Sequence, residues 1–288
     1  MKTLIITLSL IITSIPFTAQ ETEFPFPSFS PKGFISQTVG NTLIEVEYER
    51  PSARNREIFG ELVPWNKVWR TGAGKCTKIG FDREVKVGGQ NVPAGSYSLF
   101  TIPNPKEWIV IINKDTTLYG SSDYNYKEDI ARFVVKPTES NRFYETLNID
   151  IEIFQHNAKM YISWANTQIN LEIETSTNTQ MDKLIQEELL TDKNQIAYNY
   201  ASASAYLFYL GKDLSTALML ADTAIEMDKE MVWIRNVKIG IYESLHLYAN
   251  AIDEINQYLI ILRKDKEKHK NEILQLELDF ERINKLRE

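Results

Sequence analysis

Turn-forming residues are confined to one part of this chain, and this distribution restricts the fold more than any other feature. All ten prolines lie before residue 138, and ten of the twelve glycines lie before residue 121. Both residue types interrupt helices and favour turns. After about residue 180 the composition shifts to Leu, Ala, Glu and Lys, which are good helix formers. The sequence therefore predicts an α+β multidomain protein, in which a turn-rich β part precedes an all-α part.

The first part shows the period-two alternation of strands that are buried on one face. Isoleucine alternates with polar residues in the segment 148–154, and the segments 160–164 and 169–173 repeat this pattern. About nine or ten short strands at such a spacing are typical of sandwich folds. We therefore expect residues 27–176 to form an antiparallel β-sandwich of jelly-roll-like type. A closed barrel is the alternative.

The second part shows apolar residues at spacings of three and four, as on amphipathic helices. The helices are expected at residues 181–190, 193–210, 213–227, 230–246, 249–263 and 266–287. A weak repeat pairs Phe208, Leu214, Ala217 and Ala221 with Tyr242, Tyr248, Ala251 and Ile255, 34 residues later. Because this period is that of tetratricopeptide helix pairs, we expect a tetratricopeptide-like domain over residues 181–288. A generic helical bundle is the alternative, and the polar stretch 175–180 is the expected linker.

The N-terminus has the pattern of a secretory leader. Lys2 precedes an apolar run over residues 4–15, and Pro16 and small or polar residues end it. The run is shorter than the ~20 residues that a membrane-spanning helix needs, and no later segment approaches that length. We expect a signal peptide over residues 1–20, cleaved after Ala19 or Gln20. The protein is then exported, to the periplasm or the extracellular space, without a transmembrane segment.

Charge and cysteine content exclude several classes of function. The net charge is −7 and the pI is about 5.3, so the broad basic surface of a nucleic-acid-binding protein is not expected. Cys76 is the only cysteine, which excludes an internal disulfide and a thiolate metal site, and we interpret it as a structural thiol. The three histidines are scattered. The sequence indicates no catalytic residue set, no metal site and no cofactor.

A dense cluster of Arg, Trp, Gly and Pro lies between residues 48 and 73. It contains Tyr48-Glu49-Arg50-Pro51, Arg56-Glu57-Ile58-Phe59-Gly60, Val63-Pro64 and Trp69-Arg70-Thr71-Gly72-Ala73, and is followed by Gly89, Pro93-Ala94-Gly95 and Tyr97-Ser98-Leu99. With these motifs the chain resembles the bacterial family known as domain of unknown function twenty-nine-eleven, over about residues 30–175. The resemblance implies export and fusion to helical repeats, and no established activity. Gly74 departs from the family pattern, which has Asn there.

The same cluster contains the candidate site. Glycine lets a backbone approach a ligand closely, and an arginine beside it can present a planar fork to a carboxylate or phosphate. The predicted ligand-binding residues are Arg56, Trp69, Arg70, Thr71, Gly72, Asp129 and Glu145, for a small anionic or sugar ligand. A local basic patch is expected at Arg54, Arg56, Lys67 and Arg70. Alternatively, Glu145 or Asp129 pairs with Arg70 and holds the loop, which is then purely structural.

Three functions follow as hypotheses. The first is a binding or scaffolding protein of the cell envelope, whose helical domain contacts a protein or peptide partner, because helix pairs of this type present grooves to such partners. The second is an uncharacterised hydrolase or carbohydrate-binding protein with a site on the β-domain loops around Arg70. The third is a passive structural module, in which the clustered Arg, Trp, Gly and Pro residues serve only to pack the fold.

Overall fold

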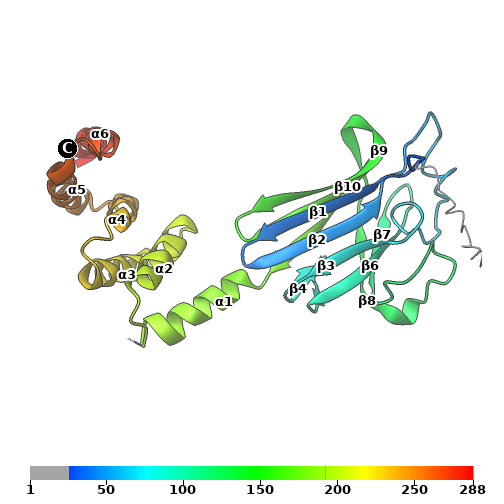
Figure 1. Ribbon diagram of the computed structural model, residues 1–288, viewed down its shortest axis with the longest axis horizontal. Coiled ribbons are helices and arrows are strands. Elements are labelled where there is room, and N and C mark those ends of the chain that lie inside the picture. Colours follow the sequence, from blue (N-terminus) through cyan, green and yellow to red (C-terminus); the bar gives the residue numbers. More distant parts are fainter. Residues whose placement is uncertain (1–25, 192, 288) are drawn as a thin grey trace, which may run out of the picture.

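The computed structural model describes residues 26–191 and 193–287. The predicted signal peptide, residues 1–20, lies outside the described residues. A β part comes first and six α-helices follow (Figure 1), which confirms the predicted α+β multidomain class. Among the described residues, no helix combines the length and the apolar character that crossing a membrane requires.

The β part consists of two antiparallel sheets. Its strands are β1 (Lys32–Val39), β2 (Thr42–Glu49), β3 (Thr77–Phe81), β4 (Val85–Val87), β5 (Gln90–Val92), β6 (Gly95–Ile102), β7 (Trp108–Asn113), β8 (Asp129–Val135), β9 (Thr138–Phe154) and β10 (Asn157–Thr175). One sheet has the order β1-β2-β3-β6-β7-β8 and the other the order β5-β4-β10-β9. A single turn of 3-10 helix, Tyr126–Glu128, precedes β8.

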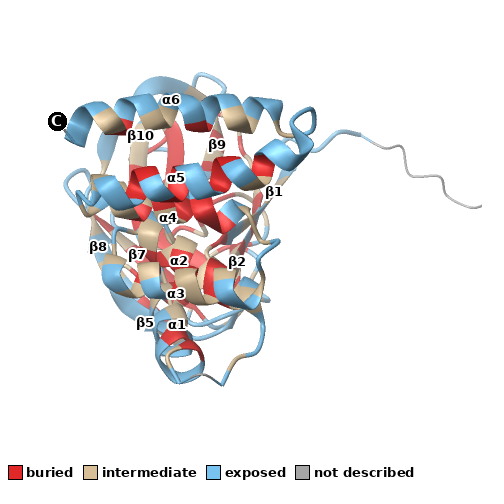
Figure 2. Cartoon of the chain, turned by 90° about the vertical axis from the view of Figure 1, so that its left-hand side faces the viewer, coloured by how far each residue is buried: buried red, intermediate tan, exposed pale blue. Residues whose placement is uncertain are grey.

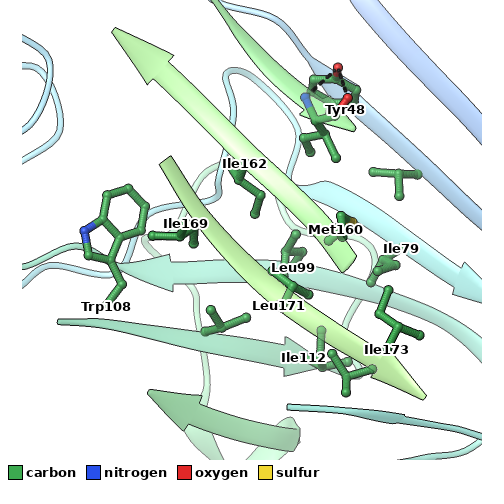
Figure 3. Packing of buried hydrophobic residues seen from close by; sticks show 14 of the residues in the cluster. Tyr48, Ile79, Leu99, Trp108, Ile112, Met160, Ile162, Ile169, Leu171 and Ile173 are labelled. Atoms are coloured by element: carbon green, nitrogen blue, oxygen red, sulfur yellow. Dashed lines mark hydrogen bonds between the residues drawn. The ribbon is translucent and has the colours of Figure 1, made fainter. Parts of the chain in front are cut away.

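The two sheets share one hydrophobic core, which makes this part a sandwich. Ile79 of β3 and Leu99 of β6 are fully buried in the same cluster as Met160, Leu171 and other residues of β10, and Figure 3 shows these side chains between the strands. Complete burial of one such side chain contributes roughly 1.5–3 kcal/mol. The period-two pattern thus identified the correct inner face of β10.

The last hairpin differs from the expected short strands. Segments 160–164 and 169–173 belong to one strand, β10, which pairs with β9 over most of its length. The pairing register shifts on both sides of Ala165, whose φ is 51°. A bulge of this kind bends a strand without ending it, so the interruption of the pattern near residue 165 marks a bend and not a turn between two strands.

The α part contains α1 (Thr177–Leu184), α2 (Ala197–Tyr209), α3 (Leu214–Met227), α4 (Trp233–Ser244), α5 (Tyr248–Leu262) and α6 (Lys270–Arg287), with a π-helical segment Ile185–Leu189 after α1. Figure 2 shows the helices layered from α1 at one edge to α6 at the other, with α2 and α3 between α1 and α4. Asp213 caps α3 by accepting a hydrogen bond from the Thr216 N–H at 3.1 Å. A side chain at Gly240 of α4 would meet the Phe208 ring of α2, so these two helices approach closely.

The predicted linker over residues 175–180 is wrong, because α1 begins at Thr177 directly after β10. The polar residues of this stretch fasten the two parts together. The Thr177 Oγ1 accepts a hydrogen bond from the Asn41 N–H at 3.0 Å, in the β1–β2 turn. The Asn178 Oδ1 lies 2.9 Å from the His156 Nδ1 and accepts a hydrogen bond from the Tyr206 hydroxyl at 2.9 Å. Their polarity thus reflects specific contacts and not solvent exposure.

A group of charged side chains is buried between α3, α4 and α5. Glu254 is 3% exposed and contacts both Arg235 and Lys238, and Lys238 also contacts Asp222 at 2.7 Å. Burial of a charge is costly unless it is paired, and here each buried charge has an opposite partner. This ion-pair network links successive helices of the α part.

Candidate functional site

A pocket of about 380 Å³ lies beside the segment that follows the end of β2, and none of its described lining residues belongs to the helical part. The long connection between β2 and β3 supplies most of its lining. The lining residues are Phe29, Ser30, Pro51, Ser52, Arg54, Arg56, Leu62, Val63, Pro64, Lys67, Val68, Trp69, Arg70, Gly72, Ala73, Ser121 and Trp164. The volume is within the range of small-molecule sites.

The inner wall of the pocket rests on a cluster of aromatic rings. Trp69 and Trp164 stack with ring centroids 5.9 Å apart, and Trp108 meets Trp69 edge-on at 6.3 Å. Phe59 packs against Trp69, Trp108 and Trp164. Aromatic pairs in these geometries contribute about 0.5–1.5 kcal/mol beyond their burial. The wall is therefore rigid and fixes the loop that carries Arg70.

Backbone and hydroxyl contacts hold that loop in one conformation. Trp69 and Thr101 exchange both backbone hydrogen bonds, at 2.7 and 2.9 Å. Thr71 is fully buried and has a φ of 54°, a strained value for a β-branched residue. Its carbonyl accepts a hydrogen bond from the Thr77 hydroxyl at 2.7 Å, and its hydroxyl lies 3.1 Å from that of Thr101. These contacts thus hold Thr71 in a backbone conformation that is unfavourable for threonine.

Four cationic side chains line the pocket: Arg54, Arg56, Lys67 and Arg70. They are the four residues of the predicted basic patch. No carboxylate of the described residues lines it. Arg56 donates to the Ser52 and Ala53 carbonyls at 2.7 and 3.0 Å, and Arg54 donates to the Phe29 carbonyl at 2.8 Å. Backbone carbonyls therefore position these two guanidinium groups without neutralising them.

Arg70 differs from the other two arginines because it contacts no acceptor among the described residues. Its Nε is buried without a hydrogen-bond partner. A buried donor that lacks a partner costs about 1–3 kcal/mol. Its Nη1 lies 3.4 Å from the Cβ that a residue other than glycine would carry at position 120. The Arg70 side chain is thus partly buried, with its donors unused.

The two predicted carboxylates do not line the pocket. The Glu145 Oε1 accepts a hydrogen bond from the Arg54 backbone N–H at 2.9 Å. Asp129 accepts from the Asn113 side chain, the Tyr124 hydroxyl and Arg132, at 2.9, 2.7 and 3.1 Å. Neither contacts Arg70, so the alternative of a structural ion pair between Arg70 and one of these carboxylates is wrong. Glu145 and Asp129 each stabilise a different loop.

The structure thus brings Arg56, Trp69, Arg70 and Gly72 together in the pocket, with Thr71 behind them. The predicted site residues omit Phe29, Ser121 and Trp164. These come from distant segments: Trp164 packs against Trp69, and Phe29 contacts the Arg54 guanidinium through its carbonyl and its ring. No signal in the sequence relates Phe29 or Ser121 to Arg70.

Gly74, the departure from the family pattern, lies outside the pocket lining. Its φ is 55°, and a side chain there would meet the Glu49 carboxylate. Asn tolerates this backbone conformation, so the family residue would fit the backbone and would lie beside Glu49. Gly74 therefore bears on the surroundings of Glu49 and not on the pocket wall.

Cys76 lies beside the pocket loop and is buried. Its thiol donates to the Gly120 carbonyl at 2.9 Å. Burial raises the pKa of the thiol to about 11, with a smaller opposing effect from the Arg70 charge. A thiol of this kind is protonated at neutral pH and is a poor nucleophile. Among the described residues, no cluster of His, Cys, Asp and Glu has the arrangement of a metal site.

Comparison with known proteins gives one match. The family described as "Protein of unknown function (DUF2911)" matches residues 30–173. No curated protein and no solved structure matches this chain. The match covers half of the chain, including every motif quoted above and nearly all of the pocket lining. The chain therefore belongs to the DUF2911 family, with a helical part following the family domain.

Proposed function

We propose that this protein is an exported binding protein whose β domain holds a small anionic ligand in the pocket around Arg70. The charge of the pocket supports this most directly. Four cationic side chains line it without a carboxylate of the described residues, in a chain whose net charge is −7. Arginine forks are suited to carboxylate and phosphate groups, and Arg70 has no acceptor within the described part of the protein.

Binding has more support than hydrolysis. A hydrolase needs a positioned general base, or a nucleophile that such a base activates. The described lining of the pocket includes three serines, Ser30, Ser52 and Ser121, but no carboxylate, imidazole or thiol that would activate them. A neutral sugar is also less favoured, because the charged side chains here are all hydrogen-bond donors. The arrangement supports an anion that is held and not cleaved.

The helical part supports a second proposal, a protein or peptide partner in the cell envelope. Tyr198 near the start of α2 and Trp233 at the start of α4 are 60% and 38% exposed. Their ring centroids are 6.3 Å apart. Tyr198 is the second residue of α2 and Trp233 is the first residue of α4. Tyr and Trp are enriched among the residues that dominate protein-binding surfaces.

Ligand binding can be tested by calorimetry on the mature chain at low salt. The panel contains phosphate, sulfate, citrate and neutral sugars. We expect at least one anion to bind and the sugars not to bind. Arg70→Lys should weaken binding at least tenfold, because lysine keeps the charge but loses the planar fork. Arg83→Lys is the matched control, since Arg83 is half-exposed and lies outside the pocket. An absence of anion binding in the wild-type chain would refute the proposal.

Export and partner binding need separate tests. Fractionation of cells that express the full chain should recover the protein outside the cytoplasm, with a new N-terminus after Ala19 or Gln20. A cross-linked envelope partner should be lost from Trp233→Ala and retained by Arg70→Lys. Recovery of an uncleaved, cytoplasmic chain would refute export, and a partner indifferent to Trp233 would refute this role of the aromatic pair.

A further inference from the structure

We infer that the pocket recognises a phosphate monoester, and that residues 69–73 hold its phosphoryl group. This inference rests on the proposed anion-binding function and specifies the ligand. The candidates for a small anion differ in charge and in shape. A carboxylate is planar and singly charged, a sulfate ester is tetrahedral and singly charged, and a phosphate monoester is tetrahedral and carries nearly two charges at neutral pH.

The unused donors of the pocket match a tetrahedral group. Arg70 provides a planar fork and has no acceptor among the described residues. Gly72 and Ala73 also line the pocket, and their backbone N–H groups donate to no acceptor in the described part of the chain. They follow Thr71, whose positive φ is typical of concave anion-binding loops. A planar carboxylate saturates the Arg70 fork alone, whereas a phosphoryl group has a third oxygen for the N–H groups.

The surrounding charge favours a dianion. Arg54 and Arg56 lie exposed at the pocket and are positioned by the carbonyls of Phe29, Ser52 and Ala53. Lys67 is also exposed, and no hydrogen bond or ion pair joins it to another described residue. Because the attraction scales with the charge of the ligand, these three cations stabilise a dianion more than a monoanion.

The apolar part of the lining favours an ester over free phosphate. Leu62, Pro64 and Val68 line the pocket together with the exposed ring of Phe29. Inorganic phosphate would leave these side chains in contact with water. A phosphate monoester with a small non-polar body would cover them and gain free energy from the buried apolar area.

The test is calorimetry on the mature chain with phenyl phosphate, phenyl sulfate, benzoate and inorganic phosphate at low salt. We expect phenyl phosphate to bind at least tenfold more tightly than phenyl sulfate and benzoate, and more tightly than inorganic phosphate. Lowering the pH from about 7.5 to 5 passes the second phosphate pKa near 6. This change in pH should weaken the binding of phenyl phosphate and leave the binding of phenyl sulfate unchanged.

Two variants assign the contacts. Arg70→Lys should remove most of the affinity for all four anions. Lys67→Ala should reduce the preference for phenyl phosphate over phenyl sulfate, and Lys86→Ala, an exposed lysine outside the pocket, should not. If the anions bind with similar affinity and all depend on Arg70, the phosphate inference is refuted and the anion-binding function stands. If none binds, both are refuted.

Discussion

Replacement of Arg70 by methionine separates a binding role from a structural role, because the two roles predict opposite changes in stability. Breaking a buried Arg–carboxylate pair costs about 3–5 kcal/mol. Arg70 has no such partner among the described residues, and its buried Nε lacks an acceptor. Three other cations line the same pocket. We therefore expect Arg70→Met to stabilise the ligand-free protein.

The magnitude follows from the unpaired donor. An unsatisfied buried donor costs about 1–3 kcal/mol. Since Arg70 is only partly buried, the gain should lie in the lower part of this range, at about 1–2 kcal/mol. Methionine keeps an unbranched apolar stem and adapts to irregular spaces, so little packing is lost. For a unit of this size, such a gain raises Tm by about 2–8 °C.

Thermal unfolding measures this change when it is followed by tryptophan fluorescence, because four of the five tryptophans lie in the β part. The buffer must contain neither phosphate nor a polycarboxylate. The order of stability should reverse when phenyl phosphate is added, because the wild type alone gains about 2.7 kcal/mol at a hundredfold excess over Kd. A Met variant that is less stable by 3 kcal/mol or more without ligand would refute the reasoning, since it would show that Arg70 holds the fold together.

Three further predictions concern other parts of the chain. Glu254→Gln should destabilise the helices by about 3–5 kcal/mol in denaturant unfolding followed by circular dichroism, because it leaves the buried charge of Arg235 without a carboxylate partner and leaves Lys238 with Asp222 alone; an effect below 1 kcal/mol would contradict this. Cys76, whose pKa is raised to about 11, should resist iodoacetamide in the folded protein at pH 8 and react on unfolding. The raised pKa favours the protonated thiol in the folded state, so the stability that Cys76 contributes is complete below a pH of about 8.5 and is lost as the pH rises toward 11. Rapid alkylation of Cys76 in the native protein would contradict the raised pKa. Asp213→Ala should cost α3 about 1 kcal/mol through loss of the cap, with Asp253→Ala, inside α5, as the control.

The sequence predicted the class of each element well where the pattern was local. Strand periodicity located the inner face of β10 and helix periodicity located the helical part, because side chains recur on one face every two residues in strands and every 3.6 in helices. The same logic failed at Ala165, where a bulge bends β10 without ending it. It also failed at Thr177 and Asn178, whose polarity serves hydrogen bonds to distant residues and not a solvated linker.

At the candidate site, too, the local sequence predicted some features and the tertiary structure decided others. The composition of residues 48–73 predicted a loop rich in arginine, tryptophan and glycine, and the four residues of the basic patch do line one pocket. The pairing of Arg70 with Glu145 or Asp129 was a reasonable alternative that the structure contradicts. Glu145 accepts a hydrogen bond from the Arg54 backbone N–H instead, and Asp129 accepts one from Arg132. Sequence separation carries no information on such competition.

The sequence by itself determined the β-then-α order, the family, the apolar faces and the presence of cationic side chains in one segment. These properties depend on residue type and on short-range spacing. Tertiary structure alone decided that Phe29, Ser121 and Trp164 join that segment, and that Arg70 has no acceptor among the described residues. The physical reason is that a pocket and an unpaired charge are defined by which distant segments the packing of the two sheets brings together.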